Sequence, residues 1–174
     1  EVQSEPGTGS TFLIKLNCEI APAGERRDAP EPQPSGGIEK GLFAGRRFLI
    51  AEDNAINSEI ICEILKMCGA ETVVRSNGAL AVEAFRDAVP GTYDAILMDI
   101  QMPEMDGYEA ARTIRSDSRP DAKSIPIIAM TANAFEQDVN AALEAGMDAH
   151  LSKPIEPERL FQTLHHHMGR KNKV

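Results

Sequence analysis

The residues from Tyr93 to Gly107, YDAILMDIQMPEMDG, constrain the fold more than any other stretch of this chain. Ala95 to Met98 is continuously apolar, which favours a strand covered on both faces, as in a parallel sheet between layers of helices. The run ends at one acid, Asp99, before the loop that contains Pro103. Ligands of parallel sheets gather at the carboxyl ends of the strands, so Asp99 is a candidate site residue. An aspartate that merely ends a strand shows the same pattern.

Short apolar segments alternate with segments of helical periodicity from Arg46 onward. The predicted strands are 48–51, 72–74, 95–98, 125–130 and 149–151. The predicted helices are 54–68, 79–89, 107–115, 135–145 and 157–167, with Gly69 and Gly146 expected to end the first and the fourth. Five strands that alternate with five helices indicate a three-layer α/β domain with right-handed crossovers.

Two of these helices have apolar faces that we expect to pack on the sheet. In the second helix the face consists of Leu80, Val82, Ala84 and Phe85. In the first helix a stripe of apolar residues runs at helical spacing, with Ile61 and Leu65 beside it: Ile56, Ile60, Ile64 and Cys68.

Side chains that can carry chemistry follow four of the five predicted strands. They are Glu52 and Asp53 after the first, Asp99 after the third, Thr131 after the fourth and Lys153 after the fifth. Parallel strands bring all of them to one edge of the sheet. Three carboxylates in one place raise one another's pKa unless a cation is present, and Mg²⁺ is the expected ion because it prefers oxygen ligands. The Lys153 ammonium would pair with Asp99.

Composition excludes several other classes of function. A net charge of -9 and an isoelectric point near 4.9 disfavour nucleic-acid binding and favour a basic or metal-bridged partner. The three cysteines, Cys18, Cys62 and Cys68, lack the spacing of a metal site, and no secretory signal is evident, so we expect a cytoplasmic location. No apolar run approaches the roughly 20 residues that cross a bilayer. We therefore expect no membrane contact by this chain, and an anchor of a longer parent protein would lie outside it.

The first 45 residues differ in character from the rest. Residues 1–20 read as a turn, EPGTGS, followed by one strand from Thr11 to Leu16. Residues 21–45 contain four prolines and five glycines with few large apolar groups, which predicts a semi-extended linker. Leu42 and Phe43, near its end, could contact the domain that follows.

Four segments resemble the response-regulator receiver domain in order, spacing and predicted strand position. They are AEDNAIN at 51–57, AILMDIQMPEMDG at 95–107, IIAMTANA at 127–134 and HLSKP at 150–154. The resemblance extends from Arg46 to about Gly169. It implies a flavodoxin-like fold whose five parallel strands lie in the order 2-1-3-4-5.

The resemblance also implies a role for each residue at the sheet edge. Asp99 would accept a phosphoryl group from phosphohistidine, with Lys153, Thr131 and the small Ala132 around that group. Mg²⁺, or Mn²⁺ in its place, would be held by the acidic pair and the acceptor together with one backbone carbonyl: Glu52, Asp53, Asp99 and Gln101.

Three further expectations come from the same resemblance. Thr131 and His150 would form a switch, His150 standing where the family usually carries Tyr or Phe; a half-exposed strand histidine without a role is the alternative. Gln101 and Asn133 would flank the path of a hydrolytic water. The bond between Lys153 and Pro154 would be cis.

The sequence SEPGTGSTFLIKL resembles the last hairpin of the ATP-binding domain of sensor histidine kinases. We therefore expect residues 1–20 to be a remnant of such a hairpin, 21–45 a linker, 46–170 the receiver domain and 171–174 a basic tail. The parent chain would be a hybrid histidine kinase. The expected partners are its dimerisation and phosphoacceptor domain and a histidine phosphotransfer protein. This chain alone would catalyse only its own aspartyl phosphorylation and dephosphorylation.

Two other functions remain open at this point. A receiver-like scaffold that never accepts phosphate usually lacks one of the acids, the threonine or the lysine, and all are present here. Phosphatases and dehalogenases with an aspartyl nucleophile resemble a D-x-D pattern after the first strand, whereas Asp99 is followed by Ile100 and Gln101.

Overall fold

The chain divides into two compact units, Glu1–Gly37 and Ile38–Val174. The computed structural model describes residues 2–5, 9–13, 15, 41–132 and 136–168. In the first unit, β1 (Val2–Glu5) pairs antiparallel with β2 (Gly9–Phe12). The sequence predicted a strand from Thr11 to Leu16, whereas β2 already begins at Gly9, opposite Glu5 of β1, and ends at Phe12. Ile14 and Leu16 lie outside the described residues. Most of the predicted linker, the basic tail and Asn133 lie outside the described residues.

The second unit contains a parallel sheet of five strands among its described residues. The strands are β3 (Arg47–Ala51), β4 (Glu71–Arg75), β5 (Ala95–Asp99), β6 (Ile127–Thr131) and β7 (Ala149–Ser152). The helices are α1 (Ala55–Met67), α2 (Gly78–Asp87), α3 (Gly107–Arg115), α4 (Glu136–Glu144) and α5 (Pro157–Met168). The strand order β4-β3-β5-β6-β7 confirms the predicted 2-1-3-4-5 arrangement.

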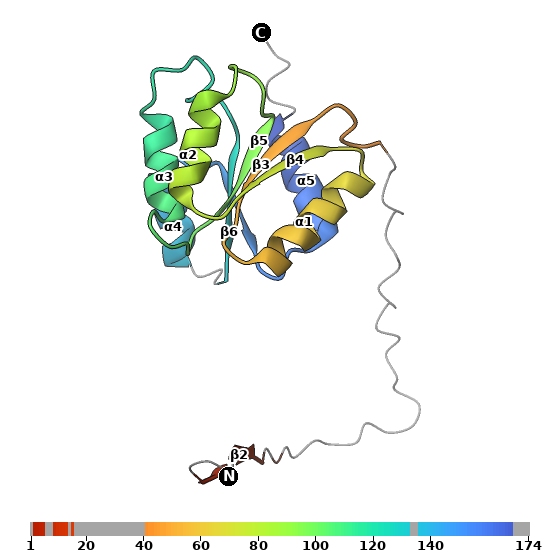
Figure 1. The fold of residues 1–174 in the computed structure, drawn as a ribbon, viewed down its shortest axis with the longest axis vertical. Helices are drawn as coiled ribbons and strands as arrows, with labels where there is room; N and C mark the ends of the chain where they lie inside the picture. The colour runs from red at the N-terminus through yellow and green to blue at the C-terminus, as the bar shows by residue number, and fades with distance from the viewer. Residues whose placement is uncertain (1, 6–8, 14, 16–40, 133–135, 169–174) are drawn as a thin grey trace. The chain divides into compact units, whose positions relative to one another are not determined.

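Helices cover both faces of this sheet, so the second unit has three layers. As Figure 1 shows, α1 and α5 lie on one face, and α2, α3 and α4 lie on the other. Alternate residues of each strand enter opposite halves of the core: Leu97 packs with α1 and α5, and Ile96 packs with the other three helices. All five residues of β5 are buried, as the continuous apolar run predicted.

In the second unit, two element boundaries differ from the prediction by two residues, and proline explains both; the other boundaries agree within one residue. α2 ends at Asp87 instead of Val89 because Val89 precedes Pro90, and a residue before proline disfavours helical backbone. β6 begins at Ile127 instead of Ile125 because Pro126 has no N–H to donate to the sheet. The bounds of α3 are those that the sequence predicted.

The orientation of α1 is the main correction to the sequence analysis. Ile56 and Ile60, predicted to face the core, are 68% and 51% exposed. The neighbouring residues Ile61, Cys62 and Leu65 face the sheet instead and are buried; of the predicted stripe, Cys68, which follows the helix, is buried. Leu80 of α2 is likewise partly exposed, whereas Ala81 is buried. Both helices have more apolar surface than the sheet can cover.

Phe43 belongs to the core of the second unit although the sequence analysis placed it near the end of the linker. Its ring packs edge-on against Phe48 at 5.4 Å and against Phe161 at 5.8 Å between centroids. Its N–H donates to the carbonyl of Cys68 at 2.9 Å. The expected contact between Phe43 and the following domain is therefore present.

The part of the chain that the structure describes contains no helix long and apolar enough to span a bilayer.

Candidate functional site

The parallel register brings the predicted site residues to one edge of the sheet. Glu52 directly follows β3, Asp99 ends β5, and Thr131 ends β6 beside it. Lys153 follows β7, and its N–H donates to the carbonyl of Thr131 at 2.7 Å. These side chains therefore lie at or directly after strand ends, where backbone hydrogen bonds of the sheet hold the chain in place.

The backbone at Gly107, where α3 begins, lies against the end of β5. The N–H of Gly107 donates to the carbonyl of Ile100 at 3.0 Å. A Cβ at Gly107 would lie 2.2 Å from the carbonyl oxygen of Asp99, so only glycine fits there. Asp106 caps α3 by accepting from the N–H of Glu109 at 2.8 Å. The loop after Asp99 therefore returns to the strand that carries it.

Lys153 forms ion pairs with two buried carboxylates. Its Nζ lies 2.6 Å from Oδ2 of Asp99 and 2.8 Å from Oε2 of Glu52. Glu52 is 2% exposed and Asp99 is 4% exposed, whereas Asp53 is exposed. The Lys153–Pro154 bond is cis, which confirms that prediction.

Burial and charge shift the pKa values of the central pair. The pKa of Asp99 lies above its ordinary value, chiefly because the carboxyl group is buried. The hydrogen bond from Lys153 lowers this pKa, and the negative charge of Glu52 raises it again. Burial lowers the pKa of Lys153, but its contacts with Asp99 and Glu52 outweigh burial and raise it overall. Lys153 is therefore held as a cation, and the Asp99 carboxylate favours further positive charge nearby.

The acidic residues fit a divalent cation. Glu52, Asp53 and Asp99 each offer a carboxylate oxygen, and these oxygens lie within 4.8 Å of one another. Three carboxylates face one ammonium, so two negative charges are left to balance. In addition, the buried Oε2 of Glu52 has no hydrogen bond of good geometry; its charge is met only by the ion pair with Lys153. Hard oxygen ligands of this kind suit a cation such as Mg²⁺.

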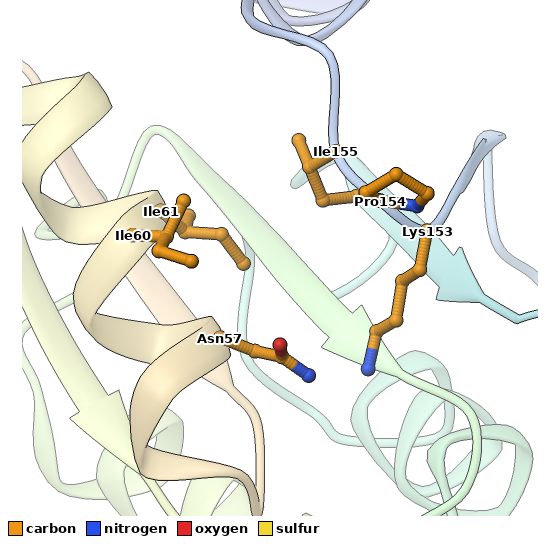
Figure 2. A pocket seen from close by; sticks show the side chains of 6 residues that line it. All are labelled: Asn57, Ile60, Ile61, Lys153, Pro154 and Ile155. Carbon is orange, nitrogen blue, oxygen red and sulfur yellow. The ribbon is translucent and has the colours of Figure 1, made fainter.

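Asn57 is the residue at this site that the sequence analysis missed. Its Nδ2 donates to Oε1 of Glu52 at 2.9 Å. The available signal was its position five residues after Glu52, in the first turn of the helix, from which a side chain reaches back to the strand end. A pocket of about 90 Å³ opens between α1 and the loop after β7 (Figure 2), and it is lined by Asn57, Ile60, Ile61, Lys153, Pro154 and Ile155.

The remaining predicted residues surround this centre at different depths. Thr131 is buried at the end of β6, and Ala132 after it is exposed. Gln101 is exposed, and its N–H lies 3.3 Å from Oδ1 of Asp99. His150 is exposed on the edge strand β7, next to the buried Leu151. Its proposed part in a switch stays a prediction.

The sequence of this domain also matches a known family. The family model for the response regulator receiver domain matches residues 48–165, a span that includes every residue of the site. The chain belongs to the receiver domain family. The three-layer fold and the strand order are those of a flavodoxin-like receiver domain.

The curated relatives of this receiver domain include long histidine kinases. Probable histidine kinase 2 of Oryza sativa subsp. indica is 41% identical over 132 residues, which is 70% of this chain and 13% of that protein. Histidine kinase 3 of Arabidopsis thaliana is 35% identical over 157 residues, and the sensor protein GacS of Pseudomonas syringae pv. syringae is 33% identical over 165. These matches cover 79% and 94% of this chain. The chain spans only 15% and 17% of the length of those two relatives.

Solved structures of receiver domains share this fold. The receiver domain of a sensor histidine kinase from Pseudomonas aeruginosa PAO1, solved with a magnesium ion in its active-site cleft, is 37% identical with a TM-score of 0.65. The match covers 72% of this chain and 99% of that one. The receiver domain of Ssk1 from Saccharomyces cerevisiae, solved with the histidine phosphotransfer protein Ypd1, is 27% identical with a TM-score of 0.65. That match covers 76% of this chain and 94% of the other.

Proposed function

We propose that this receiver domain accepts a phosphoryl group on Asp99 within a phosphorelay and that its parent is a hybrid histidine kinase. The observation that carries the proposal is the buried pair of Asp99 and Lys153, 2.6 Å apart, beside two further acids. Every residue type that the chemistry needs is present, and the similarity to receiver domains of histidine kinases supports the same role.

The transfer would proceed by direct attack of the Asp99 carboxylate. A carboxylate oxygen forms a bond to the phosphorus of a phosphohistidine while the phosphorus–nitrogen bond breaks, and the electron pair stays on the imidazole. Asp99 needs no general base because its reacting form carries no proton. Lys153 would pair with the transferred phosphoryl group instead of with Asp99 alone. Thr131 would donate its hydroxyl to that group, and Ala132 is small enough to leave the approach open.

The acids would hold Mg²⁺, or Mn²⁺ in its place. Asp53, Asp99 and the backbone carbonyl of Gln101 would bind the ion, and buried Glu52 would act through water because Asn57 and Lys153 already contact its two oxygens. When bound, the ion supplies positive charge beside the phosphoryl oxygens.

The partner that delivers or removes the phosphoryl group would cover the rim beside Asp99. Ile56 and Ile60 are exposed on α1. Ile60 lines a pocket that also contains Lys153, which contacts Asp99 (Figure 2). A partner whose histidine reaches Asp99 must therefore contact this face. We infer that it binds a histidine phosphotransfer domain or the phosphoacceptor domain of the kinase, in agreement with the structure of Ssk1 with Ypd1.

The proposed setting is the cytoplasm, inside a longer hybrid kinase. Cys62 and Cys68 are buried free thiols, which agrees with a reducing compartment. The antiparallel pair β1 and β2 agrees with the proposal that residues 1–20 are the last hairpin of an ATP-binding domain.

Reaction with acetyl phosphate in the presence of Mg²⁺, followed by intact-mass measurement, tests the function. We expect one phosphate adduct on the native chain and none on Asp99→Asn. A phosphate-independent scaffold would give no adduct on either protein. A phosphatase would consume acetyl phosphate without a lasting adduct. Either of these results would overturn the proposal.

A further inference from the structure

We propose that Asn57 is a positioning residue that orients the Glu52 carboxylate toward the metal site. This inference rests on the proposed function, because it concerns how the receiver domain binds Mg²⁺. It adds a residue to the site, since Asn57 neither reacts nor binds the ion itself.

The contacts of Glu52 show how its carboxylate is oriented. Asn57 Nδ2 donates to Oε1 at 2.9 Å, and Lys153 Nζ lies 2.8 Å from Oε2. Each carboxylate oxygen therefore has one fixed neighbour, and the plane of the carboxylate cannot turn without breaking one of these contacts. Glu52 is 2% exposed, so water cannot readily replace the Asn57 amide.

Asn57 is itself held on a rigid element. It lies in the first turn of α1, where its own N–H donates to Oδ1 of the cap residue Asn54 at 3.3 Å. Figure 2 shows the side chains of Asn57 and Lys153 extending toward one another from opposite walls of the pocket. A donor fixed on a capped helix holds its acceptor more rigidly than one on a loop.

The chemical type of Asn57 fits this role. The site combines three carboxylates with the single ammonium of Lys153, and it needs the remaining negative charge to attract a divalent ion. An amide donates a hydrogen bond to Glu52 and adds no charge. An aspartate at position 57 would add a fourth carboxylate, and a lysine would compete with the metal.

The test compares Mg²⁺ affinity by isothermal titration calorimetry on the full chain. Asn57→Ala is expected to weaken Mg²⁺ binding on the order of 10-fold, as loss of an outer-shell partner does in other metal sites. Asn57→Leu, which keeps the side-chain size and cannot donate, should do the same. Ser58→Ala is the matched control, because Ser58 lies in the same turn but its hydroxyl donates to the carbonyl of Ala55. It should bind Mg²⁺ as the native chain does.

A double-mutant cycle with Glu52→Gln separates positioning from a general effect on the helix. If Asn57 acts through Glu52, Asn57→Ala should change the affinity less than about two-fold in the Glu52→Gln background. The acetyl phosphate reaction of Asn57→Ala should also recover its native rate at saturating Mg²⁺. The same loss in both backgrounds, or no loss in either, would overturn the inference while leaving the proposed function intact. Absence of Mg²⁺ binding by the native chain would overturn both.

Discussion

At Lys153 a single ammonium contacts two buried carboxylates, while the exposed Asp53 lacks such shielding from solvent. The two members of the acidic pair therefore differ, although they are adjacent in the sequence. Glu52 is enclosed by Asn57 and Lys153, and Asp53 is open to an ion from solution. The difference in burial between these two neighbours is a property of the tertiary structure.

We therefore expect Asp53→Asn to weaken Mg²⁺ binding and phosphorylation far more than Glu52→Gln. A directly bound carboxylate contributes its full charge to the ion, whereas one that acts through water contributes about 10-fold to 100-fold in affinity. A Mg²⁺ titration of both variants, followed by calorimetry, measures the difference. Equal losses would show that the two acids have the same role.

Away from the site, the side chain of Arg119 links the loop after α3 to the end of α2. Its guanidinium pairs with both oxygens of Asp121, at 3.1 Å each, and lies 4.3 Å from the centre of the Phe85 ring. It also donates to the carbonyls of Phe85, Arg86 and Ala88 at the end of α2. Burial raises the pKa of Asp121, but hydrogen bonds from Arg119 and from the N–H of Gly91 outweigh burial and lower it.

This lowered pKa predicts an acid-dependent loss of stability. A carboxyl whose folded pKa lies below its unfolded value of about 3.9 stabilises the fold above that value. The stabilisation is lost as the pH falls through the folded pKa. Asp121→Asn should therefore be less stable than the native chain at pH 7, and the difference should shrink toward pH 2. Urea unfolding at several pH values measures it; a difference that stays constant would rule out this account.

At the scale of elements, two loops and one helix face determine what can reach Asp99. The loop between β5 and α3 returns to the strand at Gly107, and the loop after β7 brings Lys153 beside Asp99. α1 presents exposed isoleucines next to the same site. Each of these elements makes its own testable contribution.

Gly107→Ala should destabilise the domain by about 1–3 kcal/mol, because its Cβ would overlap the backbone of Asp99. The rate of reaction with acetyl phosphate should fall as well, since the end of β5 must shift. Urea unfolding and intact mass report the two effects. Arg112→Ala, an exposed position on the same helix, is the control and should change neither by much. A Gly107→Ala protein with native stability would contradict the backbone geometry.

The double variant Ile56→Ser with Ile60→Ser tests α1 as a partner surface. Transfer from a phosphorylated histidine phosphotransfer protein should slow about 10-fold, as expected for loss of an apolar anchor from an interface. Reaction with acetyl phosphate should keep its native rate, because that donor needs no protein surface. Leu143→Ser, at an exposed leucine of α4, is the matched control for loss of an exposed apolar side chain. Equal effects on both donors would indicate damage to the site itself.

At the scale of the whole molecule, the site and its core lie within the second unit. Every contact of Glu52, Asp99 and Lys153 described above joins residues of Ile38–Val174. The two halves of the hydrophobic core also consist of residues from Phe43 onward.

Removal of residues 1–37 should therefore leave the receiver domain folded and reactive. We expect the free energy of unfolding to change by less than about 0.5 kcal/mol, as for surface changes away from the core. Mg²⁺ affinity and the yield of acetyl phosphate adduct should also be native. Urea unfolding, calorimetry and intact mass measure the three quantities. A truncated chain that binds Mg²⁺ more weakly would show that the first unit supports the site.

The sequence by itself determined the order of the elements and the edge of the sheet where the chemistry lies. Apolar runs and helical periodicity are local properties, and parallel strands carry Asp99, Thr131 and Lys153 to one edge by topology alone. The rotation of α1 was decided by the tertiary structure, because periodicity defines the faces of a helix but not which one meets the sheet. For that reason the side chains of Ile56 and Ile60 are exposed to solvent instead of packed on the sheet. The hydrogen bond from Asn57 to Glu52 was likewise decided there, since it depends on how a helix and a strand end are placed in space.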